Sequence, residues 1–285
     1  MLFHHSFRRV LAPGACIVVV MGLAGCGGGS GGEAEGGNEG GSGEGSGQQG
    51  GTLTVLAASS LTDAFGELGE TFEEQNPGVE VRQSFESSST LLAQIQQGAP
   101  TDVFASAAEE EMDTAVEDGL IAGEPEVFVR NREVIMVPRD NPANIQDFQD
   151  VAKPGVRLVL AQEDVPAADY AVEILGKANS EYGSGFKQDV LSNIVSREAD
   201  VRAAVNRVVV GDADATFGYA SDYTPDIRDQ VEVIQIPPDL NIIATYPVAA
   251  LKEAEDPELA REWVELVTSE EGQQVLEKWN FEPAA

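Results

Sequence analysis

The sequence predicts an α/β protein with two lobes, each a mostly parallel sheet flanked by helices, joined by two extended crossover segments. Short apolar runs alternate with segments whose apolar residues recur at helical spacing, which is typical of parallel strands covered by helices. This alternation occurs twice, on either side of a β-rich segment at residues 127–138. A second extended segment at residues 242–251 precedes two closing helices. Periodicity alone leaves a single continuous sheet as the alternative.

The first set of strand–helix units begins at Thr52. Its strands are short apolar or alternating runs, and its helices end at turn-forming residues such as Asn76-Pro77-Gly78 or at a glycine that suits a helix C-terminus. We expect strands at residues 53–57, 79–82 and 102–105, and helices over residues 61–72, 91–98 and 109–119.

The second set occupies the middle of the chain, and two helices close it. Asp256 followed by Pro257 is typical of a helix start, because Asp caps the helix and Pro fits its first turn. The predicted lobes are residues 52–130 with 247–285, and residues 131–246, with hinges near residues 130–133 and 244–247. In the second set we expect strands at residues 156–160, 215–219 and 231–234, and helices over residues 167–179 and 200–208. The first closing helix should start at residue 257, and the second should cover residues 269–279.

The first 25 residues have the organisation of an export signal. Arg8 and Arg9 precede an apolar stretch, residues 10–23, that is too short and wrongly flanked for a stable membrane span. The stretch ends in Leu-Ala-Gly-Cys at residues 23–26, which resembles the lipobox of bacterial lipoproteins. We therefore expect Cys26 to become the lipidated first residue of an extracytoplasmic protein anchored to the cell membrane. An ordinary secretory signal with an incidental cysteine is the alternative.

Residues 26–51 follow this signal and are rich in glycine, with four glutamates among them. Such a composition predicts a flexible, mildly self-repelling tether rather than a folded element. Its root-mean-square span is roughly 25–30 Å, from about 5–6 Å times the square root of its length. We expect the tether to let the folded part sample the space above a membrane protein.

Composition excludes several functions. Both histidines and Cys16 lie in the predicted signal, so the mature chain would contain no histidine, and no cysteine besides Cys26. Without histidine, the mature chain cannot form a histidine-based zinc site or a Ser-His or Cys-His catalytic pair. The net charge of −32 argues against a nucleic acid partner, because binding nucleic acid requires clustered positive charge. We expect the acidity to serve solubility.

Small polar residues recur where a predicted strand ends and a helix begins. Ser59-Ser60 follows the first strand, residues 87–90 are Ser-Ser-Ser-Thr before the second helix, and Asp200-Val201 opens a later helix. Helix N-termini carry unpaired N–H groups and a partial positive charge, so they bind anions without lysine or arginine. Ligands of open α/β sheets bind at these strand ends. The alternative for each serine is a simple helix cap.

The same positions carry a resemblance to a known family. Residues 55–64 (VLAASSLTDA), 84–91 (SFESSSTL) and 98–107 (GAPTDVFASA) resemble three motifs of the molybdate-binding proteins of ABC importers. The likeness extends in order over residues 52–281 and continues at three later motifs, residues 164–167, 199–202 and 218–222. Two positions depart from the family pattern, since Ala168 replaces a common glycine and Glu86 a common small residue. We expect Glu86 to point to solvent.

The resemblance implies a type II periplasmic-binding-protein fold that closes on molybdate or tungstate and delivers it to the ABC permease of a molybdate importer. It implies a binding protein rather than an enzyme, with no cofactor and with the metal bound only as its oxyanion. We expect a monomer. Carried over by position, hydroxyls of Ser60, Ser88 and Tyr219 and backbone N–H groups of Ser60, Ser88, Ala167 and Val201 bind the ligand.

Other ligands and other classes of protein are the alternatives. A tungstate-preferring, sulfate-binding or phosphate-binding protein would share the fold, and hydrogen phosphate would need an acceptor such as Asp63 or Asp200. An enzyme would need a base for an exposed serine, and the lysines of the mature chain lie far in sequence from both serine clusters. A surface adhesin or structural lipoprotein would have no use for two serine clusters at strand ends.

Overall fold

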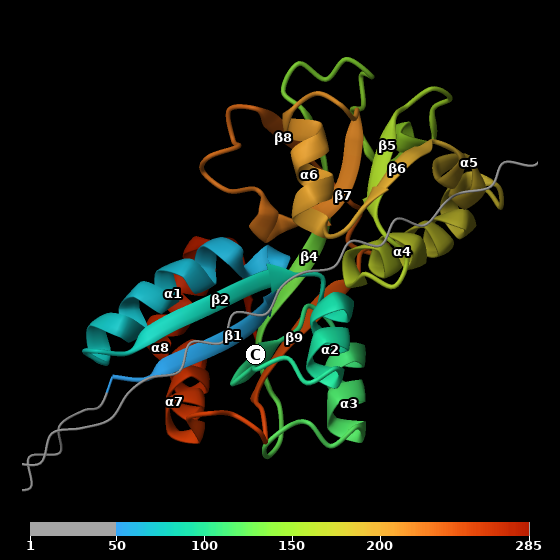
Figure 1. Cartoon of the computed structure of the whole chain (residues 1–285). Helices are drawn as coiled ribbons and strands as arrows, with labels where there is room; N and C mark the ends of the chain where they lie inside the picture. Colours follow the sequence, from blue (N-terminus) through green and yellow to red (C-terminus); the bar gives the residue numbers. More distant parts are fainter. Residues whose placement is uncertain (1–49, 285) are drawn as a thin grey trace, which may run out of the picture. The chain divides into compact units, whose positions relative to one another are not determined.

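The computed structural model describes residues 50–284. The predicted signal, Cys26 and nearly all of the predicted tether lie outside the described residues. Within them the strands form two groups, each flanked by helices (Figure 1). We call the group that contains β1 (Thr52–Ala58) the first sheet, and the group that contains β5 (Leu158–Ala161) the second sheet.

The first sheet is built around β1. Strands β2 (Glu80–Glu86) and β3 (Val103–Ala105) pair parallel to β1 on its two sides, and β9 (Ile243–Ala250) pairs antiparallel to β3. The short β10 (Glu282–Pro283) pairs antiparallel to β4. The first lobe consists of this sheet and the helices that pack with it: α1 (Thr62–Gln75), α2 (Ser88–Gln96), α3 (Glu109–Glu117), α7 (Pro257–Thr268) and α8 (Glu270–Lys278).

The second sheet repeats this plan. Strands β6 (Ile194–Glu198) and β7 (Ala215–Tyr219) pair parallel to β5, and β8 (Val231–Gln235) pairs antiparallel to β4. A short 3-10 turn, η3 (Ala220–Asp222), follows β7. The second lobe consists of this sheet and its helices: α4 (Pro166–Tyr182), α5 (Phe186–Ser192) and α6 (Val201–Val209).

One strand passes from the first sheet into the second. The 13-residue β4 (Glu126–Pro138) pairs with β9 as far as Arg132, opposite Ile243. From Glu133, opposite Tyr219, it pairs with β7 instead. The two sheets are therefore linked through the hydrogen bonds of β4, and the strand order runs β2-β1-β3-β9-β4-β7-β5-β6. The predicted two-lobed α/β architecture is confirmed, and the crossover strands make each sheet mixed, since they run antiparallel to their neighbours.

Two elements of the second lobe escaped prediction. Helix α5 has only seven residues, and β6 is a sheet edge without a buried residue. Neither carries the long apolar periodicity on which prediction depends. The predicted helix over residues 167–179 also extends further, to Tyr182, where Gly183 with φ of 105° ends it.

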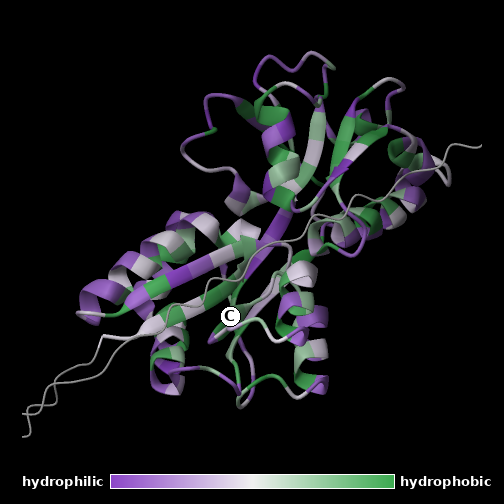
Figure 2. Ribbon diagram, in the orientation of Figure 1, coloured by the Kyte–Doolittle hydropathy of each residue, from purple (hydrophilic) through white to green (hydrophobic). Residues whose placement is uncertain are grey.

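The core of the first lobe contains a helix from each end of the chain. Trp263 of α7 is fully buried and packs edge-on against Phe65 and Phe72 of α1, with ring centroids 5.5 Å apart in both pairs. The second lobe has its own aromatic cluster around Phe148 and Phe186. The helix ribbons alternate between hydrophobic and hydrophilic residues (Figure 2), as expected for helices with one face on a sheet.

Candidate anion-binding site

A small cavity lies between the two lobes and is lined by the predicted site residues. Ser60 and Ser88 reach it from the first lobe, and Ala167, Val201 and Tyr219 reach it from the second. Each of these five residues is less than 5% exposed. The structure therefore brings together every residue that the sequence predicted for the site. Four of them lie at the start of a helix or in a 3-10 turn, and Tyr219 lies at the end of a strand.

The two serines of the second cluster have different surroundings. Ser87 is the N-cap of α2, and its Oγ accepts a hydrogen bond from the Thr90 N–H at 3.2 Å. Ser88, the first residue of the helix, lines the cavity, and its Oγ accepts a hydrogen bond from the Ala107 N–H at 2.9 Å. Because the Ser88 hydroxyl accepts from Ala107, its own proton is free to be donated elsewhere. Ser87 is therefore the serine that caps the helix, whereas the Ser88 hydroxyl is available to a ligand in the cavity.

Ser60 sits in the 3-10 turn that joins β1 to α1. Its Oγ lies 2.9 Å from the Tyr246 hydroxyl of β9, and Asn131 Nδ2 donates to the same tyrosine at 3.5 Å. Burial raises the pKa of Tyr246 well above its usual value, so the phenol keeps its proton. Sequence reasoning missed Tyr246 as a neighbour of the site, although it lies in the segment predicted to form a hinge.

The second lobe supplies two helix starts. Helix α4 begins at Pro166, and α6 begins at Val201 after Asp200, whose Oδ1 accepts a hydrogen bond from the Ala203 N–H at 3.0 Å. N–H groups in the first turn of a helix have no acceptor within that helix, so those of Ala167 and Val201 can serve a ligand. Asp200 is a helix cap and does not line the cavity, which removes it as an acceptor for a protonated oxyanion.

Tyr219 ends β7, lines the cavity and has a buried hydroxyl without a hydrogen-bond partner in the described part of the chain. Burial raises the pKa of Tyr219 well above its usual value, with smaller contributions from neighbouring acidic groups, so the phenol remains a donor. Leaving a buried hydroxyl unpaired costs about 1–3 kcal/mol. An acceptor in the cavity would remove that cost.

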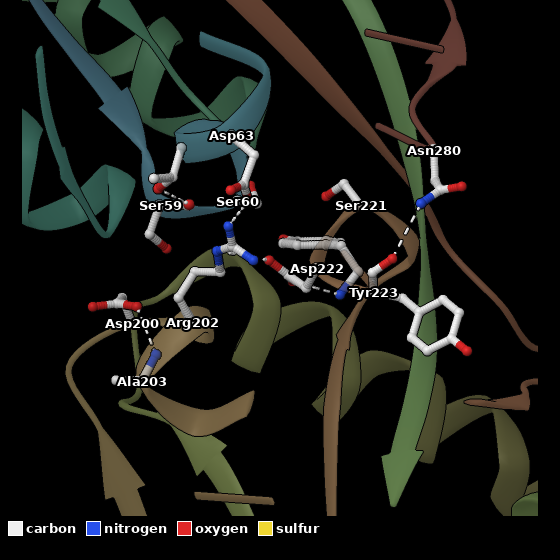
Figure 3. A network of polar contacts seen from close by, with 12 residues as sticks. Ser59, Ser60, Asp63, Asp200, Arg202, Ala203, Ser221, Asp222, Tyr223 and Asn280 are labelled. Atoms are coloured by element: carbon white, nitrogen blue, oxygen red, sulfur yellow. Dashed lines mark hydrogen bonds and ion pairs between the residues drawn. The ribbon is translucent and has the colours of Figure 1, made fainter. Parts of the chain in front are cut away.

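The charged groups near the cavity pair with one another. Arg202 of α6 contacts Asp63 of α1, and its Nε lies 3.7 Å from Asp222 Oδ1 (Figure 3). Asp222 Oδ2 in turn accepts a hydrogen bond from the Tyr219 N–H at 2.9 Å. Burial raises the pKa of Asp222 to about 6, although Arg202 opposes the shift. Glu86 is half-buried at the end of β2 and does not line the cavity, whose lining is neutral.

One buried carboxyl group has no predicted role. Glu133 is fully buried on β4, directly opposite Tyr219, and neither of its carboxyl oxygens has a hydrogen-bond partner within the described residues. Burial, together with the nearby Asp222, raises the pKa of Glu133 well above its usual value. A glutamate inside the apolar run of residues 133–138 was the signal that could have identified it.

Two α/β lobes that share crossover strands and enclose a cavity of neutral donors define a solute-binding protein. The chain matches the family described as bacterial extracellular solute-binding proteins over residues 53–282, and it belongs to that family. Its relatives are solute-binding proteins of transporters rather than enzymes, as predicted. Such proteins work outside the cytoplasm with an ABC importer. Within residues 50–284, no helix is both long and apolar enough to cross a membrane.

Three similar proteins illustrate the relationship. The molybdate-binding protein ModA of Mycobacterium tuberculosis is 36% identical over 230 residues, which is 81% of this chain and 84% of that protein. The putative ABC transporter substrate-binding lipoprotein YvgL of Bacillus subtilis is 29% identical over 232 residues, covering 81% and 86% of the two chains. The solved substrate-binding domain of a putative molybdenum ABC transporter from Clostridium difficile superposes with a TM-score of 0.62 at 27% identity, covering 82% of this chain and all of that one.

Proposed function

We propose that this chain is the molybdate-binding component of an ABC importer and delivers the anion from the interlobe cavity to the permease. One observation carries the proposal: five residues named from the sequence, drawn from both lobes, line one cavity, and one of them, Tyr219, has an unpaired buried hydroxyl. The similarity to a mycobacterial molybdate-binding protein over most of both chains supports the choice of ligand.

The chemistry of the lining favours a fully ionised dianion. Hydroxyl groups of Ser60, Ser88 and Tyr219 and the backbone N–H groups of two helix starts can all donate, and the lining contains no carboxylate. Molybdate and tungstate carry no proton at neutral pH and need only donors. Hydrogen phosphate would require an acceptor for its proton, and that acceptor is missing from the lining. Sulfate has the same hydrogen-bonding pattern as molybdate, so we propose that the size of the cavity discriminates between them.

Release of the ligand requires the lobes to separate. We propose that residues 52–130 with 247–285 move as one lobe and residues 131–246 as the other. The change of pairing partner between Arg132 and Glu133 of β4, and the end of the β4–β9 pairing at Ile243, support hinges at these points. A few residues that absorb a backbone rotation are sufficient for such hinge motion.

The same proposal covers the attachment of the protein. Lipidation of Cys26 and a tether over residues 26–51 would hold a monomeric binding protein close to its permease at the membrane. The motif at residues 23–26 supports this, and the related YvgL protein is named a lipoprotein.

Unfolding temperatures measured with added oxyanions test the ligand. Molybdate at 100 times its Kd should stabilise the fold by about 2.7 kcal/mol, a rise in Tm of roughly 5–10 °C for a protein of this size. We expect molybdate and tungstate to give this rise, and sulfate and phosphate at the same concentration to give little. A rise with sulfate or phosphate but not with molybdate or tungstate would contradict the proposal.

Replacing Cys26 with serine tests the anchor. A serine cannot accept the lipid, so the exported protein should move from the membrane fraction to the soluble extracytoplasmic fraction. Cell fractionation followed by immunodetection measures this distribution. The matched control is Cys16→Ser, which changes the other cysteine and should leave the protein in the membrane fraction. Membrane attachment of the Cys26→Ser protein equal to wild type would exclude the proposed anchor.

A further inference from the structure

An ion pair connects the two lobes beside the anion cavity. Arg202 is the second residue of α6, a helix that packs on the second sheet, and its guanidinium contacts the carboxylate of Asp63 in the first turn of α1. Helix α1 packs on the first sheet. Figure 3 shows the guanidinium between Asp63 and Asp222. Among the ion pairs within residues 50–284, Arg202–Asp63 is the one that joins a helix of the first lobe to a helix of the second.

The pair is adjacent to proposed ligand donors on both sides. Arg202 directly follows Val201, and Asp63 comes three residues after Ser60, yet neither charged residue lines the cavity. Asp222 holds the other side of the guanidinium and belongs, like Arg202, to the second lobe. Opening of the lobes would therefore separate Arg202 from Asp63 and leave Arg202 with Asp222.

We propose that the Arg202–Asp63 pair is a latch that stabilises the closed conformation and so lengthens the residence of the bound anion. Both residues act by positioning the lobes, since neither touches the cavity. Their side chains are only 24% and 28% exposed, so solvent and salt screen the pair less than they screen surface ion pairs. The choice of molybdate as the anion in the test rests on the proposed function. The latch itself rests on the Arg202–Asp63 contact between α6 and α1.

Such an attraction opposes the repulsion between acidic residues elsewhere on the interlobe surface. A second hollow between the lobes is lined by Glu110 and Glu111 of α3 and by Asp164 and Asp169 at the start of α4. Burial, together with the carboxylates of Asp164 and Glu110, raises the pKa of Asp169. Carboxylates from opposite lobes repel each other when the lobes close. Across the same interlobe boundary, Arg202 and Asp63 attract.

The test compares two charge-neutralising variants of one helix. Asp63→Asn removes the interlobe charge pair, and Glu67→Gln, one turn further along α1, removes an ion pair with Lys278 that lies within the first lobe. Titration calorimetry and stopped-flow displacement give the Kd and the dissociation rate of molybdate for the full-length protein. Small-angle X-ray scattering without ligand gives the radius of gyration, and unfolding curves verify that each variant folds.

We expect Asp63→Asn to raise the Kd about threefold to thirtyfold, mainly through faster dissociation, because removing one partner of a charge pair acts chiefly on the off-rate. It should also enlarge the ligand-free radius of gyration, while Glu67→Gln changes neither. Adding Arg202→Gln to Asp63→Asn should raise the Kd less than the two single changes combined, because they remove the same pair.

The outcomes separate the latch from the choice of ligand. If Asp63→Asn matches Glu67→Gln in Kd, dissociation rate and radius of gyration, there is no latch. If wild type and variants all fail to bind molybdate, and Asp63→Asn alone has an enlarged radius, the latch holds and the molybdate assignment is wrong. If molybdate binds wild type and every variant equally and the radius is constant, the assignment holds and the latch is overturned.

Discussion

Replacing Ser60 and Ser88 together with alanine should raise the Kd for molybdate by about a hundredfold to ten-thousandfold. Each serine would lose a hydrogen bond to a charged ligand worth about 1.5–3 kcal/mol, and each 1.4 kcal/mol corresponds to a factor of ten. Titration calorimetry of the double variant measures the change. The backbone donors and the Tyr219 hydroxyl remain, so we expect weakened binding at high concentration rather than none.

The two serines also support the unliganded protein, so stability must be measured beside affinity. Ser88 accepts from the Ala107 N–H, and Ser60 bonds the Tyr246 hydroxyl. Alanine leaves the Ala107 N–H without its acceptor, at about 1–3 kcal/mol, and leaves the Tyr246 hydroxyl with only the longer contact from Asn131. Ser87→Ala is the matched control, because it removes the helix cap one residue from Ser88 and should cost about 1 kcal/mol of stability without changing the Kd. A double variant with wild-type affinity would place the ligand elsewhere.

The prediction of strand–helix units succeeded because those elements have a local signature. Strands β1, β3, β5 and β7 are short, mostly buried runs, and α1, α6 and α7 carry one apolar face that repeats at helical spacing. The serines were identified by the same local logic, since a polar residue between a strand and a helix lies at the carboxyl edge of the sheet. Ala167 and Val201 have no such signal, because a backbone N–H can be supplied by any residue, and only the family resemblance indicated them.

What escaped prediction depends on distant pairing. The Ser60–Tyr246 contact joins residues 186 positions apart, and the Arg202–Asp63 pair joins residues 139 positions apart. No periodicity reports which side chains meet across a cleft. Asp63 and Asp200 could both be interpreted from sequence as helix-start residues, and the structure assigns them different surroundings. Asp200 caps α6, whereas Asp63 contacts the opposite lobe.

Glu133→Gln should stabilise the protein at neutral pH, by an amount that grows as the pH rises. Below its ordinary pKa of 4.5, Glu133 is protonated in both the folded and the unfolded chain, so it adds no pH dependence. Above that pH the unfolded chain releases the proton while the buried group retains it. The free energy of unfolding then falls by about 1.4 kcal/mol per pH unit until the raised pKa of the folded state is reached. Glutamine has no proton to lose, so the variant avoids this penalty.

Denaturant unfolding of wild type and Glu133→Gln between pH 4 and pH 8 measures the difference in stability directly. Both proteins retain Asp222, whose pKa burial raises to about 6, so its contribution largely cancels in the difference. Glu126→Gln is the matched control, because it makes the same change at an exposed position of the same strand, β4, and its stability should differ from that of wild type by a nearly constant amount across this range. A pH-independent difference for Glu133→Gln would mean that Glu133 is ionised in the folded protein. If Glu133→Gln instead becomes less stable relative to wild type as the pH rises, the Glu133 carboxylate has a partner that glutamine cannot replace.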